Sequence, residues 1–253
     1  MTDDVKKSEE CQRLVRTHDP DRFLISLYFP SEIRPYLWAL YAFNYEIAKT
    51  REIVTDTTIG LIRLQWWRDA IEGMYERNAV LEHDVVEGMA EAMWRFNLPR
   101  EFLDHMIYAR EFDLEDRSAG SLEGLCNYAD FTHTPLLRLS AMVVGENPDH
   151  PALQPVAMAY ALTGLLRARP FHQAQGWDLI PEGMPVSAIR EKAADLLRQS
   201  ASRDEGKLVR LHRVISEQYL NKIKRLGDNV TDARLGVPPV FRPFKLWAAA
   251  RGK

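Results

Sequence analysis

The chain has 253 residues, of which 46% are hydrophobic and 27% are charged, and its formal net charge at pH 7 is −3. Basic residues are spread along the sequence, which argues against a nucleic-acid-binding protein. The two cysteines, Cys11 and Cys126, are too few for a cysteine-rich zinc site and suit a reducing compartment. The polar start of the chain resembles neither a signal peptide nor a transit peptide, and no uncharged apolar run reaches the ~18 residues of a spanning helix. We therefore expect a cytoplasmic protein that contacts a membrane only peripherally.

Hydrophobic periodicity predicts helices in the first half of the chain. A polar N-terminal helix is expected within residues 1–17, ahead of the break at Pro20. Apolar residues at helical spacing then predict a central helix over residues 32–52, apolar in its first half and charged at its end. A helix over residues 59–77 carries apolar residues on more than one side, so we expect other helices to enclose it.

The second half of the chain shows the same helical pattern. Long helices are predicted over residues 122–144, over an alanine-rich segment at 152–169 that should end before Pro170, and over 204–227. Residues 238–253 form an aromatic and basic C-terminal segment. No stretch alternates apolar and polar residues, and no linker rich in Gly or Ser interrupts the chain. The sequence therefore predicts one all-α domain over residues 1–253, a helical bundle that surrounds a central apolar cavity.

Four segments resemble one family in collinear order. They are residues 21–27 (DRFLISL), 39–43 (ALYAF), 64–68 (LQWWR) and 161–167 (ALTGLLR). This pattern is similar to the squalene and phytoene synthases, and the resemblance implies the isoprenoid-synthase fold. Those enzymes join two prenyl diphosphates head to head, with magnesium held by acidic motifs on two facing helices. Magnesium needs hard oxygen ligands such as carboxylates, and it takes up the charge of the departing diphosphate.

Both acidic motifs are missing from this chain. Where the resemblance would place aspartates in the first motif, the sequence has Ala48, Lys49 and Glu52. Where it would place an asparagine and two acids in the second motif, the sequence has Gly164, Ala168 and His172. Positive charge stands instead near these positions, on Lys49, Arg167 and Arg169. The sequence therefore argues against magnesium-dependent ionisation, and we expect no catalytic residue, no metal ligand and no cofactor.

A narrower resemblance concerns the runs AFNYEIA at 42–48, TIGLIRLQWW at 58–67 and LRARPFH at 166–172. They are similar to the branch of the family without metal motifs, which includes the mitochondrial assembly factor 6 of respiratory complex I (NADH:ubiquinone oxidoreductase). This resemblance implies a non-catalytic assembly factor with complex I subunits or assembly intermediates as partners, and with a lipid or prenyl chain as a possible ligand. The polar N-terminus predicts a bacterial relative on the inner face of the plasma membrane. The alternatives are a magnesium-dependent prenyl transferase, with magnesium as its cofactor, and a lipid-binding carrier.

Eight residues are candidates for a pocket or an anion-binding site: Tyr41, Asn44, Lys49, Glu52, Trp66, Arg167, Arg169 and His172. Arg167, Arg169 and His172 are the sharpest group, because fixed cations can bind a phosphate or carboxylate without a metal. The competing interpretation is a structural charged patch at the end of a helix, where cations favour the helix dipole.

Three other choices stay open at this point. Lys49 and Glu52 are spaced to pair with one another on a helix. The Trp66–Trp67 pair suits either the core or the wall of a lipid pocket. The run from Phe241 to Trp247 suits either contact with a membrane or partner, or packing onto the bundle.

Overall fold

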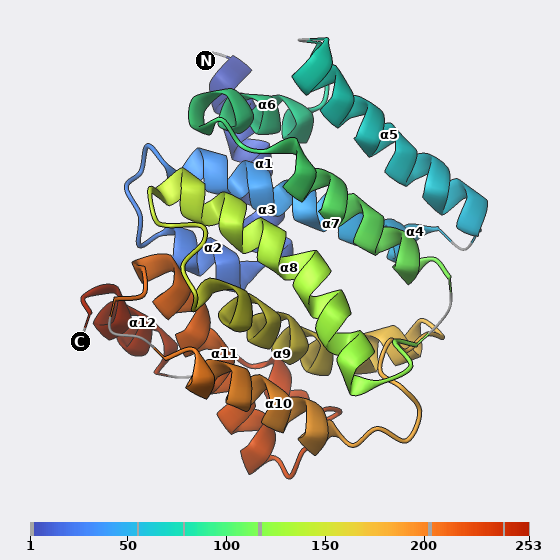
Figure 1. Ribbon diagram of the computed structural model, residues 1–253, viewed down its shortest axis with the longest axis vertical. Helices are drawn as coiled ribbons and strands as arrows, with labels where there is room; N and C mark the ends of the chain where they lie inside the picture. The colour runs from blue at the N-terminus through green and yellow to red at the C-terminus, as the bar shows by residue number, and fades with distance from the viewer. Residues whose placement is uncertain are drawn as a thin grey trace. The chain divides into compact units, whose positions relative to one another are not determined.

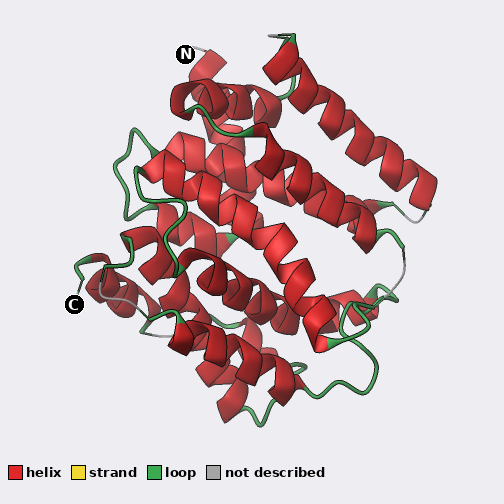
Figure 2. Cartoon of the chain, in the orientation of Figure 1, coloured by secondary structure: helices red, strands yellow, loops and turns green. Residues whose placement is uncertain are grey.

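The computed structural model describes residues 3–54, 56–77, 79–115, 118–201, 204–239 and 241–252. Throughout these residues the regular structure is helical, and no β-strand occurs among them (Figure 1 and Figure 2). The all-α prediction is therefore confirmed. The contacts of the chain divide it into two compact units. The first comprises Met1–Glu115 with Arg138–Pro148, and the second comprises Asp116–Leu137 with Asp149–Lys253.

The first unit is built around α3 (Arg34–Ala48). This helix packs against α1 (Asp3–His18), α2 (Pro20–Ser26), α6 (Asp84–Phe96) and α7 (Arg100–Asp113). Apolar side chains lie on nearly all sides of α3, and a helix of this kind is stable only when other helices enclose it. Its fully buried side chains include Leu37, Leu40, Tyr41, Phe43 and Ile47. The segment that the sequence singled out as the central helix is thus the core of this unit.

Two further helices of the first unit follow α3 in the chain. The short α4 (Thr50–Ile53) leads to α5 (Thr57–Glu76), which packs against α7. Asp56 caps α5 by accepting hydrogen bonds from the backbone N–H groups of Thr58 and Ile59. Gly60 permits close packing at this end, because a Cβ there would come within 2.7 Å of the Leu114 side chain.

The second unit contains the long helices of the C-terminal half. The first of its helices is α8 (Leu122–Val144), whose residues up to Leu137 belong to this unit and whose remainder belongs to the first. Next come α9 (Leu153–Ala174), α10 (Val186–Gln199) and α11 (Lys207–Arg225), which pack against one another. The single turn η1 (Ala233–Gly236) and α12 (Arg242–Ala250) end the chain, and α12 packs on α11.

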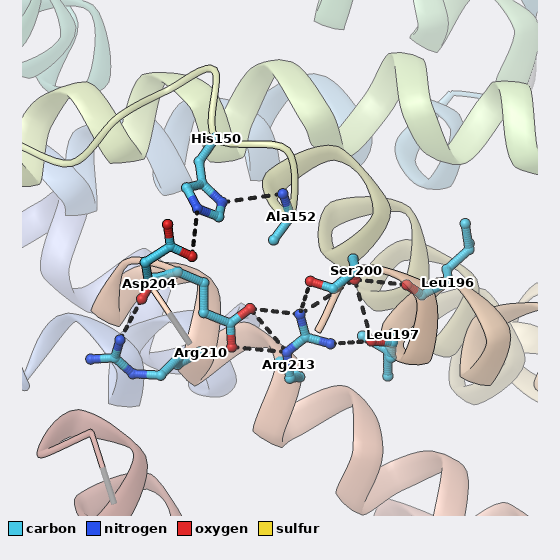
Figure 3. A network of polar contacts seen from close by, with 9 residues as sticks. His150, Ala152, Leu196, Leu197, Ser200, Asp204, Arg210 and Arg213 are labelled. Atoms are coloured by element: carbon cyan, nitrogen blue, oxygen red, sulfur yellow. Dashed lines mark hydrogen bonds and ion pairs between the residues drawn. The ribbon is translucent and has the colours of Figure 1, made fainter. Parts of the chain in front are cut away.

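The buried guanidinium of Arg213 joins the end of α10 to the start of α11 (Figure 3). Its Nη2 donates to Glu205 Oε2 at 2.6 Å and to the Ser200 carbonyl at 3.0 Å, and its Nη1 donates to the Leu197 carbonyl. The Arg213 and Glu205 side chains are only 10% and 5% exposed. One arginine therefore joins the end of α10 to α11 and balances a buried carboxylate.

Two helix limits differ from those predicted. The helix expected over 32–52 ends at Ala48, because Lys49 adopts a ψ of −8°, far from the helical value of about −42°, before α4 begins. The helix expected to end before Pro170 continues to Ala174. Pro170 removes its own N–H donor and crowds the carbonyl four residues earlier, but it lies close enough to the end of α9 for the helix to continue. The following residues restore the helix, which ends where Gln175 N–H donates to Phe171 and Gly176 turns with a φ of +83°.

Candidate functional site

The end of α3, where the first acidic motif would lie, is occupied by ion pairs. Glu46 points both of its carboxylate oxygens at cations: Oε1 lies 2.5 Å from Lys49 Nζ, and Oε2 lies 2.9 Å from Arg63 Nη2. The Glu46 side chain is 7% exposed, so these charges interact in a poorly solvated setting. Lys49 Nζ also lies 5.0 Å from the centre of the Tyr45 ring. The predicted pairing of Lys49 with Glu52 is wrong, because Lys49 binds the glutamate one turn earlier.

A second polar group lies beside it, around Arg110 of α7. Arg110 Nη2 donates to Asn44 Oδ1 at 3.4 Å, and Nη1 donates to Asp113 Oδ2 at 3.2 Å. Burial raises the pKa of Glu52 above its ordinary value, and the positive charges of Arg110 and Lys49 oppose this rise. Asn44, Lys49 and Glu52 therefore surround the same end of α3. Sequence spacing does not reveal Arg110 as their neighbour, since it is 66 residues from Asn44.

These residues do not suit magnesium. Two buried carboxylates at this helix end are already paired with cations, Glu46 with Lys49 and Arg63, and Asp113 with Arg110. Ala48 offers no ligand, and Lys49 places a positive charge where a dication would need negative ones. Among the residues that the structure describes, no three His, Cys, Asp or Glu side chains gather in a way that could hold a metal ion.

Tyr41 and Trp66 lie in different settings. Tyr41 is 1% exposed within the core of the first unit, and burial raises the pKa of its phenol to about 12. Trp66 and Trp67 contact one another edge to face, with 4.9 Å between ring centres. Trp67 is 2% exposed and packs on Phe43, whereas Trp66 is 38% exposed. The core interpretation therefore holds for Trp67 and is wrong for Trp66.

In the second unit, positive charge gathers around Tyr219. The Arg167 guanidinium lies 3.6 Å from the centre of this ring, and that of Arg242 lies 4.8 Å from it. Arg242 Nη2 also donates to the Tyr219 hydroxyl. Burial lowers the pKa of Lys222, and the nearby charges of Arg242 and Arg167 lower it further. A group of three cations next to a buried ring is chemically suited to a phosphate or carboxylate. Tyr219 and Arg242 were not among the predicted site residues.

Arg169 and His172 have partners of their own. Arg169 Nε donates to Asp178 Oδ2 at 2.8 Å, and Gln173 donates to the same oxygen. The His172 ring stacks on Trp177, with 3.9 Å between ring centres. Both side chains thus fix the turn after α9. Their proposed part in anion binding with Arg167 remains a prediction.

Comparison with known proteins places this geometry in a family. The family model described as squalene/phytoene synthase matches residues 15–185. The chain belongs to the squalene/phytoene synthase family. A crystal structure of a dehydrosqualene synthase in complex with a ligand superimposes with a TM-score of 0.81, over 98% of this chain and 96% of that one, at 14% sequence identity. This likeness confirms the predicted isoprenoid-synthase fold.

Two mammalian relatives are more similar in sequence, and both carry the name "NADH dehydrogenase (ubiquinone) complex I, assembly factor 6". The protein from Mus musculus is 35% identical over 174 residues, which cover 68% of this chain and 52% of the relative. The protein from Bos taurus is 31% identical over 215 residues, which cover 83% of this chain and 63% of the relative. The chain therefore spans between half and two thirds of the length of these relatives. None of the described helices is both long enough and apolar enough to cross a bilayer.

Proposed function

We propose that this protein is a non-catalytic member of the squalene/phytoene synthase family that acts as an assembly factor for respiratory complex I. The observation that carries the proposal is its 31–35% identity to mammalian proteins named complex I assembly factor 6. Its partners are then complex I subunits or assembly intermediates. The ion pairs at the end of α3 support the non-catalytic part, because Lys49 replaces an acidic residue of the first motif and is held there by Glu46.

We further propose that the protein works at the inner face of a bacterial plasma membrane and holds a lipid or prenyl chain. The basic group around Tyr219 supports a ligand with an anionic end, since Arg167 and Arg242 both lie on that ring. Native mass spectrometry of the purified protein tests this part. A co-purified lipid that is lost from the Arg167→Ala variant supports it, and a protein free of lipid contradicts it.

Deletion of the gene tests the assembly role. Membranes of the deletion strain should lose NADH:ubiquinone activity and intact complex I on native gels, and the wild-type gene should restore both. Succinate:quinone activity, which does not depend on complex I, is the internal control. Normal complex I in the deletion strain would count decisively against the proposal.

The alternative is a prenyl transferase that joins two prenyl diphosphates, and the observation that favours it is the fold shared with a dehydrosqualene synthase. Incubation of the protein with farnesyl or geranylgeranyl diphosphate and magnesium separates the two functions. The ion-paired Glu46 predicts no head-to-head product. Product that depends on both magnesium and intact Glu46 would overturn the non-catalytic proposal.

A further inference from the structure

Large apolar side chains stand out from the surface of the C-terminal segment. Val237, Phe241, Phe244 and Trp247 are 59%, 71%, 66% and 43% exposed. Together with Lys245 and Arg251 they form what we call the terminal surface. Exposed aromatic residues that gather in this way are uncommon on a protein surface without a binding role.

The packing of α12 explains why these rings face outward. The helix buries Arg242, Leu246 and Ala249, which share the face that lies on α11 (Figure 1). Phe241, Phe244 and Trp247 recur every three residues on the other side. The segment thus packs onto its own domain, as one of the two interpretations expected, but only through the face that carries Arg242, Leu246 and Ala249. The face that carries the aromatic side chains stays exposed.

Contacts among the exposed side chains hold the rings in one patch. Phe244 stacks with Trp247, with 6.0 Å between ring centres. The Arg251 guanidinium lies 4.0 Å from the centre of the Trp247 ring. An aromatic patch edged by cations combines an apolar body with a polar rim, and this combination suits the boundary between lipid headgroups and acyl chains.

Charge is distributed unevenly between this end and the rest of the chain. Residues 222–253 contain eight basic and two acidic residues, a net charge of +6, so the first 221 residues carry −9. Both acids are ion-paired, Asp228 with Arg190 at 2.5 Å and Asp232 with Arg234 at 2.6 Å. Lys224, Arg225, Lys245 and Arg251 are exposed. Residues 222–253 are therefore drawn to an anionic surface more strongly than the acidic first 221 residues are.

We propose that the terminal surface docks on bilayers that contain anionic phospholipids, with Phe241, Phe244 and Trp247 inserted among the headgroups and Lys245 and Arg251 on the phosphates. Charge complementarity selects this occupant, because the exposed cations Lys245 and Arg251 lie on the same terminal helix and turn as the exposed aromatic side chains. The inference rests on the proposed function only for its biological setting. It names the part of the protein that reaches the membrane.

Vesicle flotation with the purified full chain tests the proposal. The wild type should float with vesicles of phosphatidylcholine and phosphatidylglycerol, should not float with phosphatidylcholine alone, and should bind less as salt is raised. Lys245→Glu with Arg251→Glu should weaken binding roughly tenfold or more, since each cation near an anionic bilayer contributes several-fold in affinity. Phe244→Ser with Trp247→Ser should also lose binding.

Matched controls carry the same chemical changes elsewhere. Trp94→Ser with Tyr108→Ser removes two aromatics that are 52% and 63% exposed on α6 and α7. Arg16→Glu with Arg95→Glu reverses two exposed charges on α1 and α6. Both controls should bind like the wild type. Circular dichroism and the urea midpoint confirm that each variant is folded.

Bromine-labelled phosphatidylglycerol supplies a second measurement, because it quenches only tryptophans that reach the bilayer. Quenching should be present in the wild type and lost in Trp247→Phe, which keeps its affinity. The proposal would be overturned if the wild type did not float with the vesicles at low salt, or if the control variants lost as much vesicle binding as the variants of the terminal surface. Undiminished quenching in Trp247→Phe would also overturn it. Variants of the terminal surface that bind vesicles normally but fail to restore complex I would also overturn it, in favour of a protein partner. The vesicles contain no complex I, so the flotation result does not depend on the assembly role. If the deletion strain showed normal complex I, vesicle binding would still test the terminal surface.

Discussion

Lys49 and Glu46 form an ion pair at the end of α3, with 2.5 Å between Nζ and Oε1. Arg63 from α5 binds the other carboxylate oxygen. The lysine thus neutralises a buried acid on its own helix, and the same acid ties α3 to α5. Glu46, Lys49 and Arg63 therefore balance one another's charges at the end of α3. Loss of Glu46 should then lower the stability of the protein.

Glu46→Gln should lower the free energy of unfolding by about 1–3 kcal/mol. The substitution leaves Lys49 and Arg63 facing one another without a counter-charge, but both retain some access to water, which reduces the loss below that of a fully buried pair. Urea unfolding followed by circular dichroism measures the change. Glu72→Gln is the matched control, because its ion pair with Arg77 is exposed and should contribute about 1 kcal/mol or less. Equal effects of the two substitutions would contradict the prediction.

The neighbouring tryptophans of α5 should respond very differently to truncation. Trp67→Ala should destabilise the protein by about 3–5 kcal/mol, because it leaves a cavity against Phe43 in the core. Trp66→Ala should cost less, about 1–2 kcal/mol, because Trp66 is already 38% exposed and loses only its contacts with Trp67 and His83. Thermal or urea unfolding of the two variants side by side checks this contrast. A greater loss from Trp66→Ala would show that its ring is buried in solution.

Arg213→Met should destabilise the protein by about 3–5 kcal/mol, since it strands the buried Glu205 carboxylate. Adding Glu205→Gln to this variant should recover part of the loss, because the stranded charge is then removed. Arg198→Met, whose ion pair with Asp195 is exposed, should have little effect. Urea midpoints of these proteins and of Glu205→Gln alone measure the coupling, and a double variant less stable than Arg213→Met would refute the assignment of Glu205 as the stranded charge.

Glu52 should make stability depend on pH. Burial raises its pKa above the ordinary 4.5 in the folded state, so the folded protein binds this proton more tightly than the unfolded chain. The resulting stabilisation is present below pH 4.5 and is lost as the pH rises through the folded pKa. Glu52→Gln should therefore be slightly more stable than the wild type at pH 7, and the two should converge near pH 4.

Glu10 provides a control of opposite sign for that measurement. A hydrogen bond from Arg13 lowers the pKa of Glu10, so its contribution is present at neutral pH and is lost on acidification. Glu10→Gln should be the less stable protein at pH 7. Unfolding titrations at several pH values compare the three proteins, and the same sign for both variants would contradict the assignments.

Much of the fold follows from hydrophobic periodicity. The helix predicted over 122–144 is observed as Leu122–Val144, because its pattern is long and Gly145 turns the chain with a φ of +74°. Periodicity does not reveal breaks that depend on one backbone angle, as at Lys49. It also overrated Pro170 as a stop, since a proline near the end of a helix removes a single donor.

The candidate site was only partly accessible from sequence. The missing aspartates drew attention to the end of α3, where the structure places ion pairs around Glu46. The side chains that bind Glu46 and Asn44 there come from other helices. Arg63 is 17 residues from Glu46, and Arg110 is 66 residues from Asn44. Helix spacing predicts neighbours on one helix, and it therefore favoured Lys49–Glu52 over contacts that only packing creates.

The paired charges of Glu46, Lys49 and Arg63 at the end of α3 also make it difficult for single substitutions to create a metal site there. A new aspartate at position 48 would follow Glu46 and precede Lys49 in the chain, and the positive charge of Lys49 would oppose the binding of a metal cation there. Removal of either cation first would leave Glu46 buried without one of its partners. Each first step is therefore costly or without effect, so a lineage that adopts this arrangement tends to keep it.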